Sequence, residues 1–341
     1  MQEAGQNVEY SVVAEGLCKS YGAIKAIDKV SFKIAKGEIL GFLGPNGAGK
    51  STTMRILSGL MPATSGRAYV CGVSVANNPK LAQSHIGYMP ENNPLPEDVR
   101  VVEYLNFRAA IKGLKGRAIR EAVDEVMEVC QLQRKASRKI IGNLSKGFKQ
   151  RVGIADALLG KPEVIIMDEP TIGLDPHQII AIRELIDSLR GKMSVVISSH
   201  ILPEIELVCD RVMIINQGMV VASGTPENLR SEFLPVDTYK ICVSASLPEV
   251  GAVAESLGLG FEAEQISPPD AGGFATYALK TKRRGAWGDI LIKEFAKRPN
   301  MKLREVYLSR PTLEDIFMAA TRRSWEDRRE SILGKNREAE K

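Results

Sequence analysis

A glycine-rich segment, Gly44–Thr52 (GPNGAGKST), lies between an apolar run and a helical pattern. A glycine backbone can curl tightly enough to aim successive N–H groups at a phosphate chain, and the positive end of the following helix strengthens that site. In this spacing Lys50 would reach the β- and γ-phosphates of a nucleotide, and the Ser51 hydroxyl would bind Mg²⁺. An ordinary tight turn is the alternative, but the strand before the loop and the helix after it disfavour it. The segment predicts a nucleoside triphosphate site.

A pair of carboxylates, Asp168 and Glu169, ends the apolar run Val164–Met167. A buried parallel strand delivers its last residues to the carboxyl edge of the sheet, where ligands bind in open α/β folds. At that edge Asp168 would hold the Mg²⁺ shell, and Glu169 would orient and deprotonate the attacking water. By itself the pair could equally cap a helix. Together with the glycine loop upstream, it predicts a nucleotide triphosphatase.

A third segment, Leu144–Arg151 (LSKGFKQR), lies between the first two motifs and opens an amphipathic helix predicted to run to Leu159. Ser145 is placed to cap this helix, and a serine hydroxyl beside a close-approach glycine, Gly147, makes a good anion receptor. Alone, the segment would be an ordinary capped helix. In order with the other two motifs, it resembles the signature of the ATP-binding cassette family, LSGGQ followed closely by Arg.

The resemblance implies roles for three more segments. Tyr21, in KSYG, is similar to the aromatic residue that stacks on adenine in this family, and a core or turn tyrosine is the alternative. Thr171–Asp175 (TIGLD) resembles the D-loop, which connects the two sites of a cassette dimer. His200 resembles the switch histidine, whose imidazole would hydrogen-bond the γ-phosphate. In such a head-to-tail dimer, the signature of one protomer faces the nucleotide of the other.

Two features depart from the family pattern. Glu91 stands where the family usually has glutamine, and it would still ligate Mg²⁺, directly or through water. Lys146 and Phe148 replace a glycine and the glutamine of the signature. These variants, together with Arg310–Phe317 (RPTLEDIF), resemble the subgroup of gliding-motility (GldA-like), drug-export and polysaccharide-export ATPases.

The motifs and the resemblance together define the expected site. We expect as catalytic residues Lys50, Glu169 and His200; as metal ligands Ser51, Asp168 and Glu91; and as nucleotide contacts Tyr21, Gly44, Pro45, Asn46, Gly47, Ala48, Gly49, Lys50, Ser51, Thr52, Ser145 and Gly147. The expected cofactors are ATP and Mg²⁺.

The elements that position these residues are expected to form an α/β fold, which the resemblance identifies as the P-loop nucleotide hydrolase (ABC ATPase) fold. From Val8 to about Ser231, short apolar runs alternate with amphipathic stretches, the pattern of strands feeding helices in a largely parallel sheet. The predicted strands include Ile39–Leu43, Val164–Met167 and Val195–Ser198, and a hairpin pairs Arg211–Ile215 with Met219–Ala222. We expect the ABC ATPase domain to cover residues 8–232.

A second domain is expected at residues 237–321, because the pattern restarts after Pro235 in the order βαββαβ, typical of a small ferredoxin-like α+β unit. Its predicted elements are Tyr239–Val243, Leu247–Leu257, Phe261–Ile266, Phe274–Leu279, Trp287–Ala296 and Leu303–Leu308. A last helix starts near Pro311, with a capping box from Thr312 to Asp315. Residues 322–341 are densely charged and predict a solvated tail. This accessory domain would serve dimerisation or regulation.

The composition is that of an ordinary globular protein, with 341 residues, 44% hydrophobic and 26% charged, and a formal net charge of +5. Basic and acidic residues are interspersed, so nucleic acid is not implied. The five cysteines lie far apart, without a CxxC pair or a nearby histidine for a zinc site, and are expected as reduced thiols of a cytosolic protein. His85 and His177 are expected at the surface. The first residues, MQEAGQNVEYS, lack a basic start and an apolar stretch, and no run approaches about 20 apolar residues, so neither a signal peptide nor a membrane span is expected here.

The expected function is an ATP-binding and ATP-hydrolysing subunit that energises a separate membrane permease, with export favoured by the subgroup resemblance. It would act as a homodimer, or as a heterodimer with a second cassette, and would be cytoplasmic and peripheral on the inner face of the cell membrane. One alternative is a soluble cassette ATPase acting on DNA or ribosomes, but this sequence lacks the long insertions or second cassette of those types. The other is a module that uses ATP only to switch partners, because Glu91 and Phe148 depart from the pattern.

Overall fold

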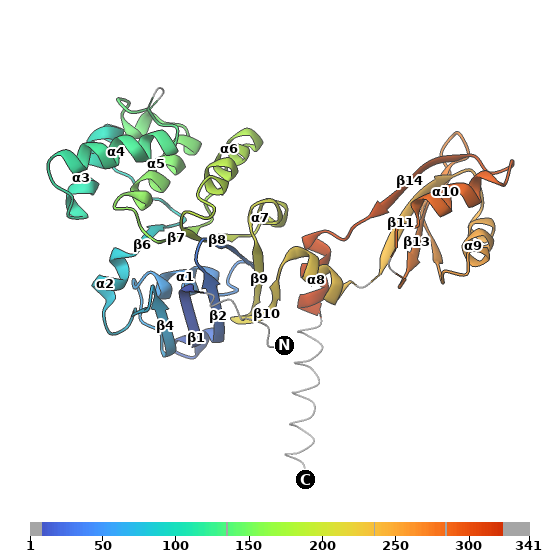
Figure 1. The fold of residues 1–341 in the computed structure, drawn as a ribbon, viewed down its shortest axis with the longest axis horizontal. Coiled ribbons are helices and arrows are strands. Elements are labelled where there is room, and N and C mark those ends of the chain that lie inside the picture. The colour runs from blue at the N-terminus through green and yellow to red at the C-terminus, as the bar shows by residue number, and fades with distance from the viewer. Residues whose placement is uncertain (1–8, 134–135, 235, 284, 323–341) are drawn as a thin grey trace, which may run out of the picture. The chain divides into compact units, whose positions relative to one another are not determined.

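The protein divides into two units, which the computed structural model describes over residues 9–133, 136–234, 236–283 and 285–322 (Figure 1). The first unit runs to Pro226 and includes the described residues from Ala320 onward, and the second unit is Glu227–Ala319. Among the helices of the described residues, none combines the length and the apolar composition that crossing a bilayer requires.

A six-stranded sheet forms the centre of the first unit, in the order β10-β9-β3-β8-β7-β6. Its strands are β3 (Ile39–Leu43), β6 (Ile86–Met89), β7 (Val164–Asp168), β8 (Ser194–Ser199), β9 (Arg211–Asn216) and β10 (Met219–Gly224). Five of them are parallel, and β10 pairs antiparallel with β9. All residues of β3, β7 and β8 are buried, as expected for strands covered on both faces. The predicted parallel sheet and its closing hairpin are confirmed.

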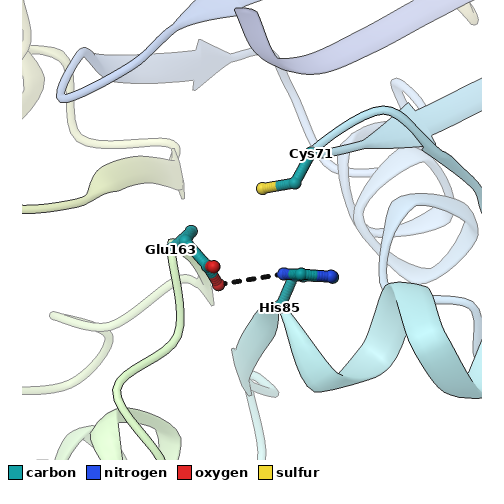
Figure 2. A group of neighbouring side chains, drawn as sticks. All are labelled: Cys71, His85 and Glu163. Atoms are coloured by element: carbon teal, nitrogen blue, oxygen red, sulfur yellow. Dashed lines mark hydrogen bonds and ion pairs between the residues drawn. The ribbon is translucent and has the colours of Figure 1, made fainter.

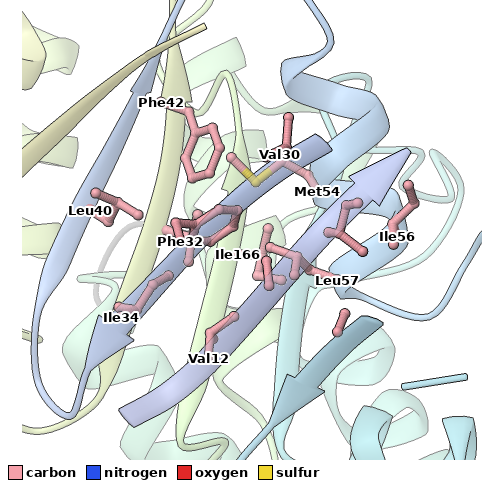
Figure 3. Packing of buried hydrophobic residues seen from close by; sticks show 14 of the residues in the cluster. Val12, Val30, Phe32, Ile34, Leu40, Phe42, Met54, Ile56, Leu57 and Ile166 are labelled. Atoms are coloured by element: carbon pink, nitrogen blue, oxygen red, sulfur yellow. The ribbon is translucent and has the colours of Figure 1, made fainter. Parts of the chain in front are cut away.

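A second sheet of the first unit is antiparallel, in the order β2-β1-β4-β5, and the sequence pattern does not predict it. Its strands are β1 (Tyr10–Tyr21), β2 (Ile24–Ala35), β4 (Ser65–Val70) and β5 (Val73–Ser74). Buried and exposed residues alternate along much of β2, so one face packs inward. That face shares an apolar core with β3 and the helix α1 (Lys50–Leu57), where Met54 lies near Phe32 and Phe42, whose ring centroids are 5.1 Å apart (Figure 3).

The first unit has the further helices α2 (Pro79–Ser84), α3 (Val101–Ile111), α4 (Arg117–Val129), α5 (Lys146–Leu158), α6 (Pro176–Asp187) and α7 (Leu202–Val208). Three of them, α3, α4 and α5, lie between β6 and β7 in the chain. Asp156 of α5 holds α3, because Tyr104 Oη and Arg108 Nε donate hydrogen bonds to its carboxylate at 3.1 and 2.8 Å. Burial, and then the Asp156 charge, raise the pKa of Tyr104, so the phenol keeps its proton as the donor. These contacts fix the helix that starts with the signature.

The second unit has the element order βαββαβ and one antiparallel sheet, β12-β13-β11-β14, preceded by helix α8 (Pro226–Phe233). Its elements are β11 (Asp237–Val243), α9 (Leu247–Ser256), β12 (Glu262–Ser267), β13 (Ala275–Thr281), α10 (Gly288–Ala296) and β14 (Leu303–Ser309). Both helices pack on the sheet through a core that includes Val253, Tyr277 and Phe295. The element order and strand order confirm the ferredoxin-like prediction.

A last helix begins at residue 313, and its predicted capping box is confirmed. Thr312 N and Oγ1 both donate to Asp315 Oδ2 at 2.8 Å, and Asp315 N donates to Thr312 Oγ1 at 3.2 Å. Ile316, in the first turn of this helix, is buried. Of the predicted tail, 322–341, everything after residue 322 lies outside the described residues. The domain limits 8–232 and 237–321 stay a prediction.

Candidate nucleotide site

The glycine loop connects β3 directly to α1, as the sequence predicts. Gly49 is the N-cap of α1 with φ of 106°, a backbone conformation that side-chain-bearing residues rarely adopt. Gly44 is required for another reason, because a Cβ atom there would lie 2.3 Å from the carbonyl oxygen of Ile215. The loop therefore takes a path that only glycine allows at both ends. The first N–H groups of any α-helix have no partner within the helix, so those of α1 are available to an anion held by the loop.

A pocket of about 530 Å³ opens over this loop. Its lining residues are Ala26, Pro45, Asn46, Gly47, Ala48, Gly49, Lys50, Ser51, Thr52, Glu91, Glu169, Ile172 and His200. Most of the expected loop residues and the three expected groups Glu91, Glu169 and His200 are thus brought together, although they come from distant parts of the sequence. Ala26 belongs to β2 and is an addition that the sequence motifs do not indicate.

Lys50, the first residue of α1, is held by the loop that precedes it. Its Nζ donates a hydrogen bond of 2.7 Å to the carbonyl oxygen of Gly44 and lies 3.5 Å from Glu169 Oε1. Only 5% of Lys50 and 5% of Glu169 are exposed. A cation with so little access to water interacts strongly with any anion that enters the pocket.

Ser51, Asp168 and Ser198 form a hydrogen-bonded group beside Lys50. Ser51 Oγ and Ser198 Oγ both donate to Asp168 Oδ1, at 3.1 and 2.5 Å. Ser198 Oγ also accepts a bond of 2.9 Å from Glu169 N. Hydroxyl and carboxylate oxygens are the ligands that Mg²⁺ prefers, so Ser51 and Asp168 fit the expected metal role. The sequence motifs do not indicate Ser198, because a serine near the end of an apolar strand carries no signal of its own.

Glu169 has a strained backbone, with φ of 51°. Its Oε2 lies 2.7 Å from His200 Nδ1 and accepts a hydrogen bond of 3.3 Å from His200 N. Left-handed conformations of residues other than glycine cost about 1–3 kcal/mol and gather at functional sites. The turn after β7 thus aims this carboxylate between Lys50 and His200, in the pocket.

A contact that the sequence does not indicate joins the D-loop to the helix after His200. Thr171 Oγ1 donates a short hydrogen bond to the carboxylate of Glu204, on α7. Burial raises the pKa of Glu204, although this hydrogen bond opposes the rise. A direct hydrogen bond therefore connects the D-loop to the helix that follows His200.

Four expected nucleotide contacts lie outside the lining of the pocket in the described structure: Gly44, whose close approach to Ile215 is described above, and Tyr21, Ser145 and Gly147. Tyr21, at the end of β1, is 46% exposed, and its Oη donates to Met61 Sδ at 2.9 Å. Ser145 occupies the predicted N-cap of α5, but within the described chain its side chain makes no capping hydrogen bond, contrary to expectation. Gly147 is buried against Gln178, whose side chain a Cβ atom would meet at 2.7 Å.

We expect Ser198→Ala to lower the ATPase rate about tenfold or more and to raise the Mg²⁺ concentration needed for half-maximal rate. The hydroxyl orients Asp168, and hydrogen bonds to charged groups contribute about 1.5–3 kcal/mol. Steady-state phosphate release over a range of Mg²⁺ concentrations measures both effects. Ser194→Ala is the control, because Ser194 is a buried serine at the other end of the same strand. An unchanged Mg²⁺ dependence in Ser198→Ala would show that this hydroxyl does not position the metal ligand.

Known proteins resemble this chain in sequence. A family model described as ABC transporter matches residues 27–172, and one described as AAA domain, putative AbiEii toxin, Type IV TA system, matches residues 138–207. Nod factor export ATP-binding protein I of Paraburkholderia xenovorans is 32% identical over 322 residues, which cover 94% of this chain and 99% of that protein. The probable multidrug ABC transporter ATP-binding protein YbhF of Escherichia coli is 38% identical over 228 residues, 66% of this chain, and the match spans 39% of that protein's length.

Solved structures show the same fold. A structure of the ATP binding subunit of an ABC transporter is similar over 65% of this chain and 92% of its own, with a TM-score of 0.59 and 32% identity. A dimeric post-hydrolysis state of the ATP-binding cassette MJ0796, bound to ADP and Pi, is similar over 63% and 98%, with a TM-score of 0.58 and 25% identity. The similarity confirms the P-loop nucleotide hydrolase fold.

Proposed function

Because the chain belongs to the ATP-binding cassette family of transporter ATPases, we propose that it binds Mg-ATP, dimerises around it, hydrolyses it and so energises a separate membrane permease. One observation carries the proposal. The loop lysine Lys50, the oxygen pair Ser51 and Asp168, and the acid–histidine pair Glu169 and His200 all gather at the glycine loop. Binding and hydrolysis of a nucleoside triphosphate need these groups together.

We assign nucleotide binding to the glycine loop and α1. Backbone N–H groups there would hold the phosphates, and Lys50 would exchange its contact with Gly44 for β- and γ-phosphate oxygens. Ser51 and Asp168 would hold Mg²⁺, with Glu91 as a further ligand at the rim of the pocket. When bound, Mg²⁺ neutralises the phosphate charge that develops during hydrolysis.

We assign hydrolysis to Glu169 and His200. The Glu169 carboxylate would accept a proton from the attacking water while the water oxygen bonds to the γ-phosphorus. The bond between this phosphorus and the β–γ bridging oxygen then breaks, which gives ADP and phosphate. His200, 2.7 Å from Glu169 Oε2, would keep the carboxylate in place and contact the γ-phosphate.

We propose that a second copy completes the site with Ser145 and Gly147 at the start of α5, where Ser145 is exposed and Gly147 lies buried behind it against Gln178. The N-terminus of a helix is a receptor for anions, so each signature would close over the γ-phosphate held by the other copy. ATP then joins two surfaces, and hydrolysis removes the joining charge. The partner copy is a second identical chain or a second cassette.

We expect Ser145→Arg to abolish ATP-dependent dimerisation while ATP still binds to the monomer. The arginine side chain would fill the space that the γ-phosphate of the other copy must enter. Light scattering, with and without ATP, measures the dimer in Glu169→Gln protein and in the double variant Glu169→Gln/Ser145→Arg. Binding of a fluorescent nucleotide to the double variant measures binding to the monomer. Ser84→Arg, at an exposed serine ending α2, is the control. An ATP dimer that survives Ser145→Arg would contradict the head-to-tail arrangement.

The transporter role rests on the relatives, two of which are named for Nod factor export and multidrug transport. We propose an exporter, with the chain peripheral on the cytoplasmic face of the membrane. The second unit, without a catalytic role, would serve dimerisation or regulation. ATPase activity distinguishes this function from an ATP-dependent binding switch. Purified protein with its permease should release phosphate continuously, and a single turnover or none would favour the switch.

A further inference from the structure

A group of three side chains lies at the amino edge of the six-stranded sheet, away from the nucleotide pocket (Figure 2). Cys71 forms the turn between β4 and β5, His85 precedes β6, and Glu163 precedes β7. One ligand atom from each residue lies within 4.8 Å of the other two, and His85 Nδ1 is 3.1 Å from Glu163 Oε2. The three side chains point toward one shared space.

The two sheets fix the backbone of all three residues. The strands β6 and β7 pair in parallel with Ile86 opposite Val164, so the residues just before them must be neighbours. Val164 N also donates to the carbonyl oxygen of His85 at 3.1 Å. This pairing at the start of the strands is set by the fold and leaves little freedom for His85 and Glu163 to separate.

Cys71 reaches the group from the antiparallel sheet. Its N–H donates a 2.8 Å hydrogen bond to the carbonyl oxygen of Ser11, and its φ of 48° is in the left-handed region. Residues other than glycine adopt this conformation at a cost, usually where the surrounding structure imposes it. The strained turn gives the thiol its position opposite His85.

We propose that Cys71, His85 and Glu163 bind a zinc ion. A thiolate, an imidazole and a carboxylate are the ligand types of zinc, whereas Mg²⁺ takes oxygen ligands. Bonds of about 2.0–2.3 Å place the ligands of a tetrahedral zinc about 3.3–3.8 Å apart, so small side-chain shifts would close the present spacing. Three protein ligands leave the fourth position for water. His85, expected at the surface, is half-buried here, and its distance along the chain from Cys71 is the reason that the sequence predicts no zinc site.

The charges around the group are compatible with a cation. The charge of Lys36 acts on Cys71, and the Lys36 ammonium is paired with Glu9 Oε1 at 2.6 Å. Lys36 already has Glu9 as its counterion, so the Glu163 carboxylate, which contacts His85, is not paired with Lys36. A bound zinc would tie the β4–β5 turn to the starts of β6 and β7 and would stabilise the first unit by mass action.

Cobalt titration of the full chain tests the proposal, because Co²⁺ replaces zinc and a thiolate ligand gives it an intense charge-transfer absorption. We expect one cobalt per chain with this absorption, displaced by zinc. Cys71→Ser should abolish the absorption, and His85→Gln and Glu163→Gln should each weaken binding at least tenfold. Zinc should raise the Tm of the unmodified protein and leave that of Cys71→Ser unchanged.

Matched controls are available in the same chain. Cys242→Ser removes a thiol of the second unit, His177→Gln removes an exposed histidine, and His200→Ala removes the histidine of the nucleotide pocket. All three should keep the cobalt absorption and the zinc-dependent Tm shift. If the thiolate absorption does not form, persists in folded Cys71→Ser, or is lost in Cys242→Ser, the proposed site is wrong. Circular dichroism establishes that each variant is folded, and Glu163→Gln, which changes few atoms, gives a second test by affinity alone.

Discussion

Replacing Glu169 with glutamine is expected to lower the ATPase rate by about 10²–10⁴-fold, the usual contribution of a general base. Glutamine keeps the shape of the side chain but cannot accept the proton of the attacking water. The carboxylate is nearly buried, and its two oxygens lie 3.5 Å from Lys50 Nζ and 2.7 Å from His200 Nδ1. Steady-state phosphate release from the purified protein, alone and with its permease, measures the loss.

ATP binding should survive this change or become tighter, since the substitution removes a negative charge close to where the γ-phosphate would lie. Glu169→Gln protein should therefore accumulate as an ATP-bound dimer, which light scattering detects. Glu184→Gln, at an exposed glutamate of α6, is the control and should behave as the unmodified protein. Near-normal turnover in Glu169→Gln would show that another group is the general base and would contradict the proposed mechanism.

Local sequence order predicted the elements of this fold well. The strands around the glycine loop and the acidic pair are continuous apolar runs, and each is found within one or two residues of its predicted ends. The second unit shows its βαββαβ order because turn residues separate every element. The sequence does not predict the antiparallel sheet of β1, β2 and β4, because its half-buried strands resemble amphipathic segments. Which strands pair with one another depends on how they pack on α1.

Contacts between distant segments account for what the motifs did not predict. In the sequence Ser198 is an ordinary strand residue, but in the structure its hydroxyl donates a hydrogen bond to Asp168 on the neighbouring strand. The bond from Thr171 to Glu204 depends likewise on how the D-loop folds back on α7. Sequence motifs identify residues that act through their own local conformation, such as those of a glycine loop. Residues that act by holding another side chain can be identified only once the structure shows which residues the sheet brings together.

Replacing Lys50 with alanine is the second change with a large expected effect, and it acts on binding. The ammonium is the buried cation of the pocket, and hydrogen bonds to charged groups contribute about 1.5–3 kcal/mol. We therefore expect ATP affinity to fall about tenfold to hundredfold, and the ATP-dependent dimer to be lost at ordinary nucleotide concentrations. Equilibrium binding of a fluorescent ATP analogue measures the affinity, with Lys192→Ala, an exposed lysine, as the control.

The same substitution should also change the protein without nucleotide. Lys50→Ala leaves the Glu169 carboxylate buried without its neighbouring cation, and an unpaired buried charge is destabilising. We expect a lower Tm for Lys50→Ala, and partial recovery when Glu169→Gln is added, because the charge that lost its partner is then gone. The nucleotide affinity should not recover in that double variant, since the phosphate-binding cation is still absent. Full recovery of ATP binding would show that Lys50 acts mainly by neutralising Glu169, and additive Tm changes would show that the two side chains do not interact.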